Sequence, residues 1–565
     1  MSELSEILPS YTSNSGSVIP MSLTLRAGAL LLLPLLTVLG CSSSAPPSTA
    51  PVVTAAIAGA PSSASEPRAC DRAMVSLFAT LRSPVHIDAY VPRGLPKVDA
   101  FVKSLREALI HHADASKGML DVRIIDSMSE GARESAKNAG LEEIAFAKAT
   151  DEAAQTTGFL GLAFAYSGEK ETIPMLLPED RRGIDFWIGS TIRELQGRAH
   201  HLTSRFGVLT GKKELKLSEQ NLLPRDGDNV SPSILSVFNA ALPIYKFEDV
   251  DLRRGDASIK TDLDGLLITQ PGEALTEREL RRIDQFLMLG NKALVIFAGA
   301  VNIKPYDPSM SVEFDTRGLT RLLDGYGIEM KSDTILDWWT SMGVETRTGA
   351  GESRTSRLPS IVVTTDPLAP STMREGDNGS FLDGSFIGFF RLSPLSFPFP
   401  STLVPHPEKQ PDARMRVVAR STSKATAEAP GSLSLKALSE LKPQGEQRER
   451  AMAIALEGRV RSAFAGVQEA GVDAPAESSG RARVLVLASP QFLTNPLARA
   501  GNTEPLPPQM AMMSSPSRGN EGLRAIGRGY ARTYLTLTIS ALKKTLDWAV
   551  IDDDLAACIA EPLER

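Results

Sequence analysis

The clearest alternation of hydrophobic and polar positions lies in the middle of the chain. A short uncharged strand is predicted at Leu266–Thr269, and apolar residues then recur at helical spacing over Glu277–Leu289. Thr276 and Glu279 have the spacing of a capping box, which predicts where this helix begins. A second apolar strand is predicted at Ala293–Ala298. A strand, a capped helix and a strand in this order indicate a right-handed βαβ unit of a parallel sheet.

Further strands and helices alternate on both sides of this unit. Strands are predicted at Phe206–Gly211 and Tyr245–Val250, with a helix at Pro232–Leu242 between them. Near the C-terminus a buried strand is predicted at Val484–Leu487 and a helix at Tyr534–Ala549, after which the acidic tail is expected to trail away. This alternation is typical of a Rossmann-like α/β domain with a parallel sheet.

The region before these elements predicts a smaller α/β domain. Two strands, Val85–Val91 and Met119–Ser127, are separated by an amphipathic helix. Phe159–Tyr166 and Glu171–Leu177 flank a Ser-Gly turn and predict a hairpin. The order of the elements suggests a thioredoxin-like fold, although no CxxC pair is present to act as a redox centre.

The N-terminal segment has the pattern of an export signal. Arg26 supplies a positive charge, and Ala27–Leu39 forms an apolar core that is too short for an ordinary membrane span. Cys41 follows Gly40 directly, which resembles a bacterial lipobox and makes Cys41 the candidate lipidation site. An uncleaved anchor and an ordinary cleaved signal peptide are the two alternatives, and all three export the rest of the chain.

The residues after Cys41 are rich in Ser, Ala and Pro, a composition that cannot bury a core and predicts a flexible tether. The chain therefore divides into six predicted regions. They are a signal peptide with an upstream extension (1–40), the tether (41–70), the thioredoxin-like domain (71–203), the first part of the Rossmann-like domain (204–344), a partly disordered insertion with some β structure (345–480), and the completion of the Rossmann-like domain with a C-terminal helix (481–565).

Composition excludes several classes of protein. A length of 565 residues is too great for one ordinary core, and a net charge of −6 argues against nucleic acid as the main partner. The three cysteines, Cys41, Cys70 and Cys558, are too few for a disulfide framework and contain no metal-binding CxxC spacing. Cys70 and Cys558 could pair in an oxidising compartment, or they could be two unpaired buried thiols.

Seven ordered segments resemble the extracytoplasmic part of the gliding-motility-type ABC-transporter auxiliary proteins. That family is related to the intraflagellar-transport-type domain, which is similar to glutamine amidotransferases. The segments occur in family order and cover most of residues 70–555. They are RSPVHIDAYV (82–91), GLAFAYSGEKETIPML (161–176), RFGVLTGKKE (205–214), DGLLITQPGEALTERELRRIDQFLMLGNKALVIF (264–297), IALEGRVRSAF (454–464), VLVLASPQFLTN (484–495) and LKKTLDWAVIDDDL (542–555).

The resemblance implies a thioredoxin-like region, a Rossmann-like or amidotransferase-like domain, and partners that are an ABC permease and its ATPase. It also implies attachment to a membrane, here through a lipid on Cys41 rather than the family's spanning helices. Two turns depart from the family pattern. The turn at 211–214 reads Gly-Lys-Lys-Glu and has no histidine, and the turn at 488–491 reads Ala-Ser-Pro-Gln where the family often has acidic residues.

No segment has the pattern of a catalytic or metal centre. The stretch GVLTGKK (207–213) has three residues between its glycines instead of four and lacks the Ser or Thr of a phosphate-binding loop. No cysteine follows a core strand and no GxSxG is present, so a nucleophile elbow is excluded. The pairs His111-His112 and His200-His201 are adjacent, which prevents either pair from chelating a metal on a helix, and they are expected at solvated helix ends. No catalytic residue, metal ligand or cofactor is therefore predicted.

Trp338 and Trp339 are the remaining feature that could bind a ligand. Adjacent aromatic side chains can stack on a sugar, although one core and one interface tryptophan is the simpler interpretation. The sequence thus predicts a non-catalytic, extracytoplasmic auxiliary component of an ABC-type transport system. The alternative is a stand-alone periplasmic protein that binds carbohydrate or is a degenerate hydrolase.

Overall fold

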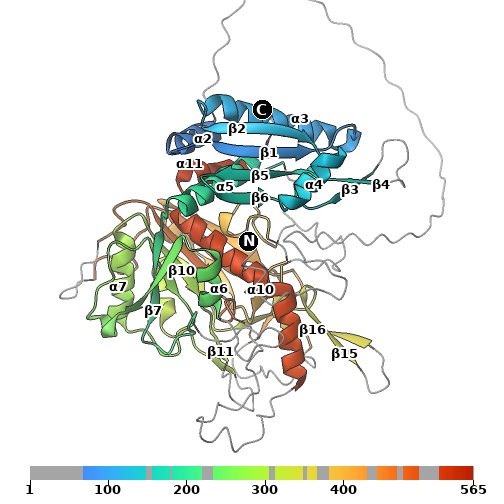
Figure 1. The fold of residues 1–565 in the computed structure, drawn as a ribbon. Helices are drawn as coiled ribbons and strands as arrows, with labels where there is room; N and C mark the ends of the chain where they lie inside the picture. The colour runs from blue at the N-terminus through green and yellow to red at the C-terminus, as the bar shows by residue number, and fades with distance from the viewer. Residues whose placement is uncertain are drawn as a thin grey trace, which may run out of the picture.

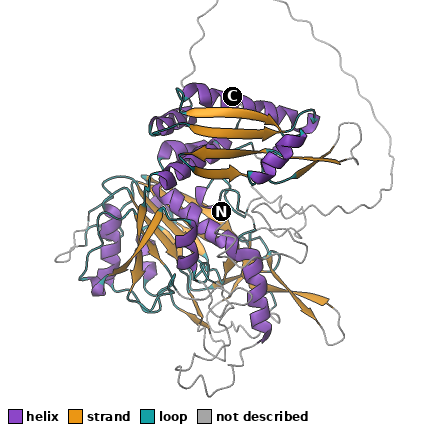
Figure 2. Ribbon diagram, in the orientation of Figure 1, coloured by secondary structure: helices purple, strands orange, loops and turns teal. Residues whose placement is uncertain are grey.

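The computed structural model describes most of the chain between residues 68 and 563. The described ranges are 68–147, 155–178, 181–218, 233–303, 312–347, 353–364, 381–392, 394–428, 442–467, 475–494 and 521–563. Cys41, the predicted signal peptide and most of the predicted tether lie outside them. Within these ranges the fold is α/β, as the sequence predicts, and its large sheet is mixed, with antiparallel strands beside the predicted parallel ones (Figure 2).

An N-terminal unit is built on a four-stranded sheet with the order β2-β1-β5-β6 (Figure 1). β1 and β2 are parallel, and β5 and β6 form the predicted antiparallel hairpin beside β1. The strands are β1 (Val85–Val91), β2 (Leu120–Asp126), β5 (Gly161–Tyr166) and β6 (Glu169–Ile173), with a separate ribbon of β3 (Ile144–Ala147) and β4 (Gln155–Gly158). The helices are α2 (Ala69–Ala79), α3 (Pro96–Ala115), α4 (Glu130–Asn138) and α5 (Ile184–Ala199). The thioredoxin-like assignment of this unit stays a prediction.

Alternate side chains of β1 point to opposite faces of this sheet, and their contacts show which helices cover each face. Val85, Ile87 and Ala89 point to one face and belong to the main hydrophobic core, together with residues of α2, α3 and α5. Tyr90 points to the other face and packs with Ala136 of α4 in a small separate cluster. The four-stranded sheet is therefore covered by three helices on one face and by the short α4 on part of the other.

The second unit is built on a nine-stranded sheet. Five strands are parallel, in the order β8-β7-β9-β10-β22, and antiparallel strands extend the sheet beyond β22. The parallel strands are β7 (Ser204–Thr210), β8 (Tyr245–Asp251), β9 (Gly265–Ile268), β10 (Lys292–Phe297) and β22 (Ala482–Leu487). The helices between them are α6 (Ile234–Ala241), α7 (Glu277–Met288) and α8 (Leu319–Gly325), and η2 (Arg253–Gly255) is a short 3-10 turn. The predicted parallel sheet is confirmed.

Helix α7 begins where the capping box predicts. The Thr276 hydroxyl accepts a hydrogen bond from the Glu279 amide at 3.3 Å, and the Glu279 carboxylate accepts one from the Thr276 amide at 2.8 Å. α7 and α8 pack on one face of the sheet in a core of their own. The opposite face packs against α10 (Glu521–Val550), which belongs to the main core shared with the N-terminal unit. Each face of the sheet is thus covered, as expected for a parallel sheet.

The polar segment 345–480 contributes strands to the large sheet. β18 (Leu403–Pro405), β19 (Ala413–Arg420) and β21 (Ala451–Gly458) pair with one another or with β22, and β13 (Ile328–Met330) pairs with β18. The smaller sheets are formed by β11 (Val301–Ile303) with β12 (Val312–Phe314), by β14 (Thr334–Asp337) with β20 (Ala425–Glu428), and by β15 (Ser341–Arg347), β16 (Ser353–Val363) and β17 (Ser396–Pro398). Two further 3-10 turns are η4 (Ile387–Phe389) and η5 (Pro407–Lys409). The division of the chain into domains stays a prediction.

The last described residues return to the N-terminal unit. They form α11 (Asp553–Ala557) and η7 (Cys558–Ala560). The expectation that this tail trails away is wrong, because Leu555 and Ile559 are apolar and are buried in the main core. Cys558 forms a disulfide with Cys70 of α2, and both cysteines are fully buried. The disulfide therefore joins the first described helix to the C-terminal end of the chain.

No helix in the described ranges combines the length and the apolar character that a membrane span needs.

Candidate functional site

The carboxyl edge of the parallel strands is the first place to look for a site. In open α/β sheets, ligands bind beyond the carboxyl ends of the strands, where the strand order reverses. The order β8-β7-β9-β10-β22 places this reversal between β7 and β9. The loops that follow these two strands, 211–218 and 269–275, therefore form the expected ligand crevice.

The chain closes this crevice with its own backbone. The amides of Gly272 and Glu273 both donate to the Lys212 carbonyl at 2.9 Å, and the Leu215 amide donates to the Gln270 carbonyl at 2.9 Å. A Cβ at position 272 would lie 2.4 Å from the Lys213 carbonyl oxygen, so only glycine fits there. The two loops are in direct contact, and no space remains between them for a ligand at this point.

Lys212, which lies where a phosphate-binding loop would place its lysine, is held by a structural ion pair. Its ammonium lies 2.7 Å from the carboxylate of Glu279, which is 2% exposed and also caps α7. The lysine therefore ties the loop after β7 to the start of α7. The neighbouring Lys213 is exposed and pairs with Glu273 at 2.8 Å, a contact that raises the pKa of the lysine.

The ends of β9, β10 and β22 are also joined to one another. The Gln270 side chain donates to the Gly299 carbonyl at 3.1 Å and accepts from the Gly299 amide at 2.9 Å. The Ser401 hydroxyl accepts from the Ala300 amide, and the Ser401 amide donates to the Ala488 carbonyl. The segment around residue 401 therefore crosses the strand ends and covers them.

The chemical character of this edge follows from its residues. None of the six histidines and none of the three cysteines lies in the loops 211–218, 269–275, 298–303 or 488–494. Across the described residues, no group of three or more His, Cys, Asp or Glu side chains is arranged to hold a metal ion. The polar groups at the edge are engaged with one another, an arrangement that can fix the loops but offers no base beside a nucleophile.

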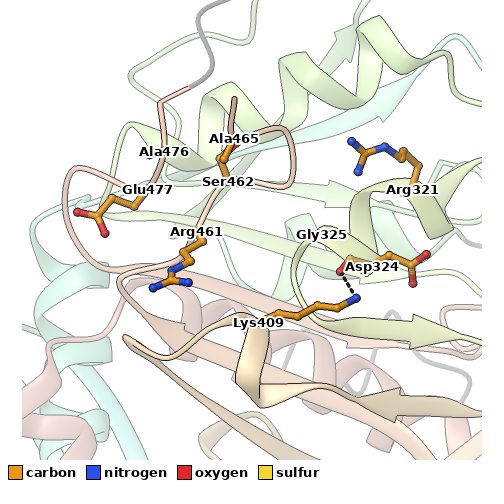
Figure 3. Close-up of a pocket in the computed structure, with 9 residues that line it drawn as sticks. All are labelled: Arg321, Asp324, Gly325, Lys409, Arg461, Ser462, Ala465, Ala476 and Glu477. Carbon is orange, nitrogen blue, oxygen red and sulfur yellow. Dashed lines mark hydrogen bonds between the residues drawn. The ribbon is translucent and has the colours of Figure 1, made fainter. Parts of the chain in front are cut away.

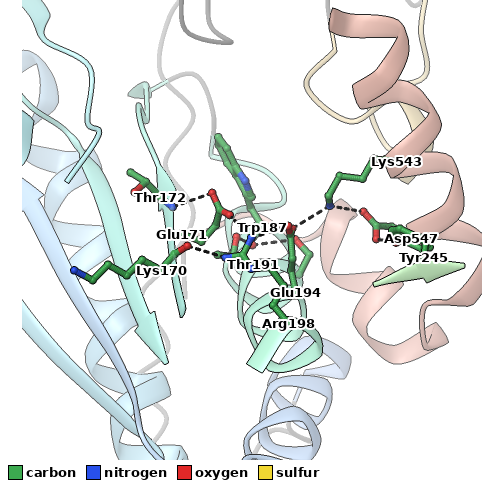
Figure 4. Close-up of polar contacts among 11 residues, drawn as sticks. Lys170, Glu171, Thr172, Trp187, Thr191, Glu194, Arg198, Tyr245, Lys543 and Asp547 are labelled. Atoms are coloured by element: carbon green, nitrogen blue, oxygen red, sulfur yellow. Dashed lines mark hydrogen bonds and ion pairs between the residues drawn. The ribbon is translucent and has the colours of Figure 1, made fainter. Parts of the chain in front are cut away.

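A second polar cluster joins the two units, and the sequence reasoning missed it (Figure 4). The Lys543 ammonium on α10 lies 3.0 Å from Glu194 of α5 and 2.9 Å from Asp547. Asp547 also accepts a hydrogen bond from the Tyr245 hydroxyl at the start of β8. Glu194 in turn contacts Arg198 at 3.2 Å. We call these five residues the joint cluster, because they connect α5 of the N-terminal unit to α10 and β8.

The electrostatics of α10 differ sharply between two neighbouring lysines. Burial by itself would lower the pKa of Lys543, but the carboxylates of Asp547 and Glu194 outweigh burial and raise it. Burial likewise would raise the pKa of Asp547, and Lys543 lowers it overall. Lys544 has no such partner: burial, together with the charge of Lys543, lowers its pKa to about 7, and its ammonium donates to the Phe390 carbonyl at 2.8 Å.

The two predicted ligand-stacking residues, Trp338 and Trp339, follow β14 and are both half-buried. Trp338 packs against the main core, and its indole N–H donates to the Thr426 hydroxyl at 2.9 Å. The Trp339 amide donates to Asp337, whereas its buried indole nitrogen has no hydrogen-bond partner among the described residues. The two tryptophans are not part of the strand-end loops. A sugar-binding role for them stays a prediction.

The two residues of the pair His111-His112 differ in exposure. This corrects the expectation that both lie at a solvated helix end. His112 is 1% exposed, and its Nε2 lies 2.9 Å from the carboxylate of Asp185, which is also buried. His112 lies on the inner face of α3, and a helix places adjacent residues about 100° apart, so its neighbour His111 is exposed. Cys41, the predicted lipidation site, lies outside the described residues.

A match to a known protein family lies over the second unit. A family model described as "ABC-type uncharacterized transport system" matches residues 204–522, which is more than half of the 565-residue chain. The chain belongs to this family. The predicted relationship to the ABC-transporter auxiliary proteins is therefore confirmed. Among curated proteins, no sequence match was found.

The family match begins and ends close to the starts of two structural elements. It begins at Ser204, the first residue of β7, and ends at the start of α10. The nine-stranded sheet and its closed carboxyl edge thus belong to the part shared with the ABC auxiliary family. The four-stranded sheet, the disulfide and α5 lie outside the match, as does most of α10 with its residues of the joint cluster.

Proposed function

We propose that this chain is a non-catalytic, extracytoplasmic binding subunit of an ABC-type transport system. In this proposal it is held to the membrane by a lipid on Cys41 and contacts the permease and its ATPase, in a system that resembles the gliding-motility type. The observation that carries the proposal is the family match over the unit whose ligand edge is closed by its own loops. A unit of this kind is suited to binding another protein through its outer surface.

The absence of histidine and cysteine from the strand-end loops supports a role other than amidotransferase-like catalysis. Such catalysis needs a thiolate and a base within hydrogen-bond reach of each other. The lysine at this edge with the greatest burial, Lys212, is neutralised by Glu279 at 2.7 Å. An enzyme of another type would need a site elsewhere in the molecule.

The buried disulfide supports an extracytoplasmic location. Disulfides persist in oxidising compartments and are rare in the reducing cytosol. Cys70 and Cys558 are both fully buried and lie 488 residues apart in the sequence. This pairing agrees with the export signal inferred from the pattern Ala27–Leu39 followed by Cys41.

Crosslinking in cells tests the transport role. A tagged full-length chain, expressed in its own host and treated with a membrane-permeant crosslinker, should capture an ATPase and a polytopic permease. An unrelated exported lipoprotein with the same tag is the control. Repeated captures that contain neither partner, at crosslinking yields that recover known complexes, would contradict the proposal.

Lipidation has a separate test. Radiolabelled palmitate should enter the wild-type chain and should not enter Cys41→Ser. Equal label in the two chains would contradict the lipid anchor without affecting the transport role.

The alternative function, carbohydrate binding by a stand-alone protein, makes a different prediction. Within the described part of the chain, no residue accepts a hydrogen bond from the buried indole nitrogen of Trp339, and a sugar hydroxyl could do so. Glycan-array binding that is lost in Trp339→Ala, together with absence of transporter subunits from the crosslinked material, would favour this alternative. Trp338→Ala is the less informative variant, because Trp338 also packs in the core.

A further inference from the structure

Two hollows adjoin at the edge of the nine-stranded sheet where β22 begins, opposite the closed strand-end loops. The first has a volume of about 610 Å³ and the second about 490 Å³. They share the same two stretches of chain: Arg461 and Glu477 line the first, and Arg459 and Ser479 line the second. The two hollows are therefore neighbours on this edge of the sheet.

The first hollow is lined by three cationic side chains from three separate segments. Arg321 comes from α8, Lys409 from η5, and Arg461 from the loop after β21 (Figure 3). In Figure 3 the guanidinium of Arg321 points towards the segment around Ser462, whereas the carboxylates of Asp324 and Glu477 point away from the hollow. The guanidinium of Arg461 also points away, and it lies 3.7 Å from the carboxylate of Asp412, so Arg321 and Lys409 are the cations that face the hollow.

The guanidinium of Arg321 is held in place by contacts that do not include a close ion pair. Its guanidinium lies over the ring of Phe464 at 4.5 Å from the centroid and donates to the Ala463 carbonyl at 3.1 Å. Lys409 donates to the carbonyl of Asp324 at 3.2 Å. In the described part of the chain, neither side chain lies within ion-pair distance of a carboxylate. Neither cation forms a close ion pair, although Arg321 also interacts electrostatically with Asp284 and Glu277 over a longer distance.

The second hollow follows the same pattern. Its charged lining residues are Arg414, Arg459 and Arg481 together with the carboxylates Glu457 and Asp553, and Asp553 also pairs with Arg481. Arg481 pairs with Glu457 at 3.0 Å, and Arg459 pairs with Glu477 at 3.3 Å. Arg414 is exposed and makes no ion pair with another described residue. Across the two hollows, the carboxylates offset some of the cations, and an excess of positive charge remains.

We propose that this pair of hollows is a binding site for a phosphate-type anion. The guanidinium of Arg321 presents N–H donors in a planar fork that matches a phosphate group, and Lys409 adds a mobile ammonium on the opposite side. Ala465, Ala476 and Gly325 are small residues of the lining and leave room for a tetrahedral group. The same chemistry is available from a soluble phosphate and from the headgroup of an anionic phospholipid.

Titration calorimetry of the purified full-length chain with inorganic phosphate tests the site. We expect wild-type binding that weakens with ionic strength and becomes about tenfold weaker in Arg321→Gln, because one charge-assisted hydrogen-bonding group is lost. Arg321→Lys should keep part of the affinity. Lys409→Gln, at an exposed position, serves as a second variant if the Arg321 variants fold poorly. The control is the double variant Lys216→Gln/Lys246→Gln, which removes two exposed charges elsewhere.

Vesicle binding distinguishes the two sources of phosphate. The same proteins are compared on phosphatidylcholine vesicles with and without phosphatidylglycerol, so that attachment through the N-terminal segment contributes equally to both. Phosphate binding that the Arg321 and Lys409 variants lose, with an unchanged lipid preference, supports a soluble phosphate. A phosphatidylglycerol preference that these variants lose supports a lipid headgroup. Equal behaviour of wild type, variants and control in both assays overturns the proposal.

Discussion

The disulfide between Cys70 and Cys558 provides the strongest prediction about stability. The variant Cys70→Ser/Cys558→Ser removes the link and leaves no unpaired thiol at either position. If the whole chain unfolds, the disulfide closes a loop of 488 residues, and the chain-entropy relation gives ~6 kcal/mol. If only the N-terminal unit unfolds, the loop runs from Cys70 to Ser204 (204 − 70 = 134), and the same relation gives ~5 kcal/mol.

The two values are close because the entropy depends on the logarithm of loop length, so the prediction does not depend on which unit unfolds first. Measured disulfides often contribute less than this relation gives, and we therefore expect a loss of at least about 2 kcal/mol. Such a loss corresponds to an increase of about 30-fold in the opening of the N-terminal unit.

Hydrogen exchange resolved by peptide is the suitable assay. The tryptophans are distributed over both units, with Trp187 in α5 and the others in the second unit, so fluorescence cannot separate them. Amides of α2, α3 and α11 should exchange faster in the double variant, while β9 and β10 should be unchanged. Cys41→Ser, which removes a cysteine outside the disulfide, is the control. Unchanged protection of α2 and α11, with loss of the disulfide verified by mass, would refute the reasoning.

Three further predictions concern single side chains. Lys543→Met should destabilise the joint cluster by about 1–3 kcal/mol, since it leaves Asp547 and Glu194 without their shared cation; the matched variant Lys544→Met should not. The pKa of Lys544 is lowered to about 7 in the folded chain. The unfolded chain therefore binds more protons than the folded chain between about pH 7 and 10. The free energy of unfolding should then fall as the pH falls through that range. Denaturant midpoints measured from pH 7 to 10 should lose part of this slope in Lys544→Met, and an identical slope would contradict the assignment. Thr276→Ala should cost about 1 kcal/mol through loss of the α7 cap, measured by denaturation, and no loss would show that Glu279 holds the helix end alone.

Features set by neighbouring residues could be predicted from the sequence. The capping box of α7 depends on Thr276 and Glu279, three residues apart, and the apolar strands β9, β10 and β22 are each visible as a short uncharged run. The parallel order of the sheet follows from the alternation of these elements. The fold class and the family relationship could therefore be predicted from short segments of the sequence.

Features set by distant residues were left open or missed. The pairing of Cys70 with Cys558 joins positions 488 residues apart, and the sequence left it as one of two alternatives. Lys543 and Asp547 are visible as a helical pair, but nothing local indicates that Glu194 completes the cluster. Strand β18 is only three residues long in a Pro-rich segment, so its place in the large sheet is decided by β21 and β13. The closure of the carboxyl edge likewise depends on Ser401, which the sequence gives no reason to place there.

The closed edge and the joint cluster together bear on the proposed binding role. The N-terminal unit carries both the first described residues and, through the disulfide, the C-terminal end. The unit that matches the ABC auxiliary family lies beside it, and α10 runs across that unit with its C-terminal part near α5 of the N-terminal unit (Figure 1). In the proposed arrangement, a lipid on Cys41 would keep the N-terminal unit within reach of the membrane through the predicted tether. Since the disulfide and the joint cluster resist rotation between the two units, a partner bound to the family unit would be held at a fixed position relative to the N-terminal unit.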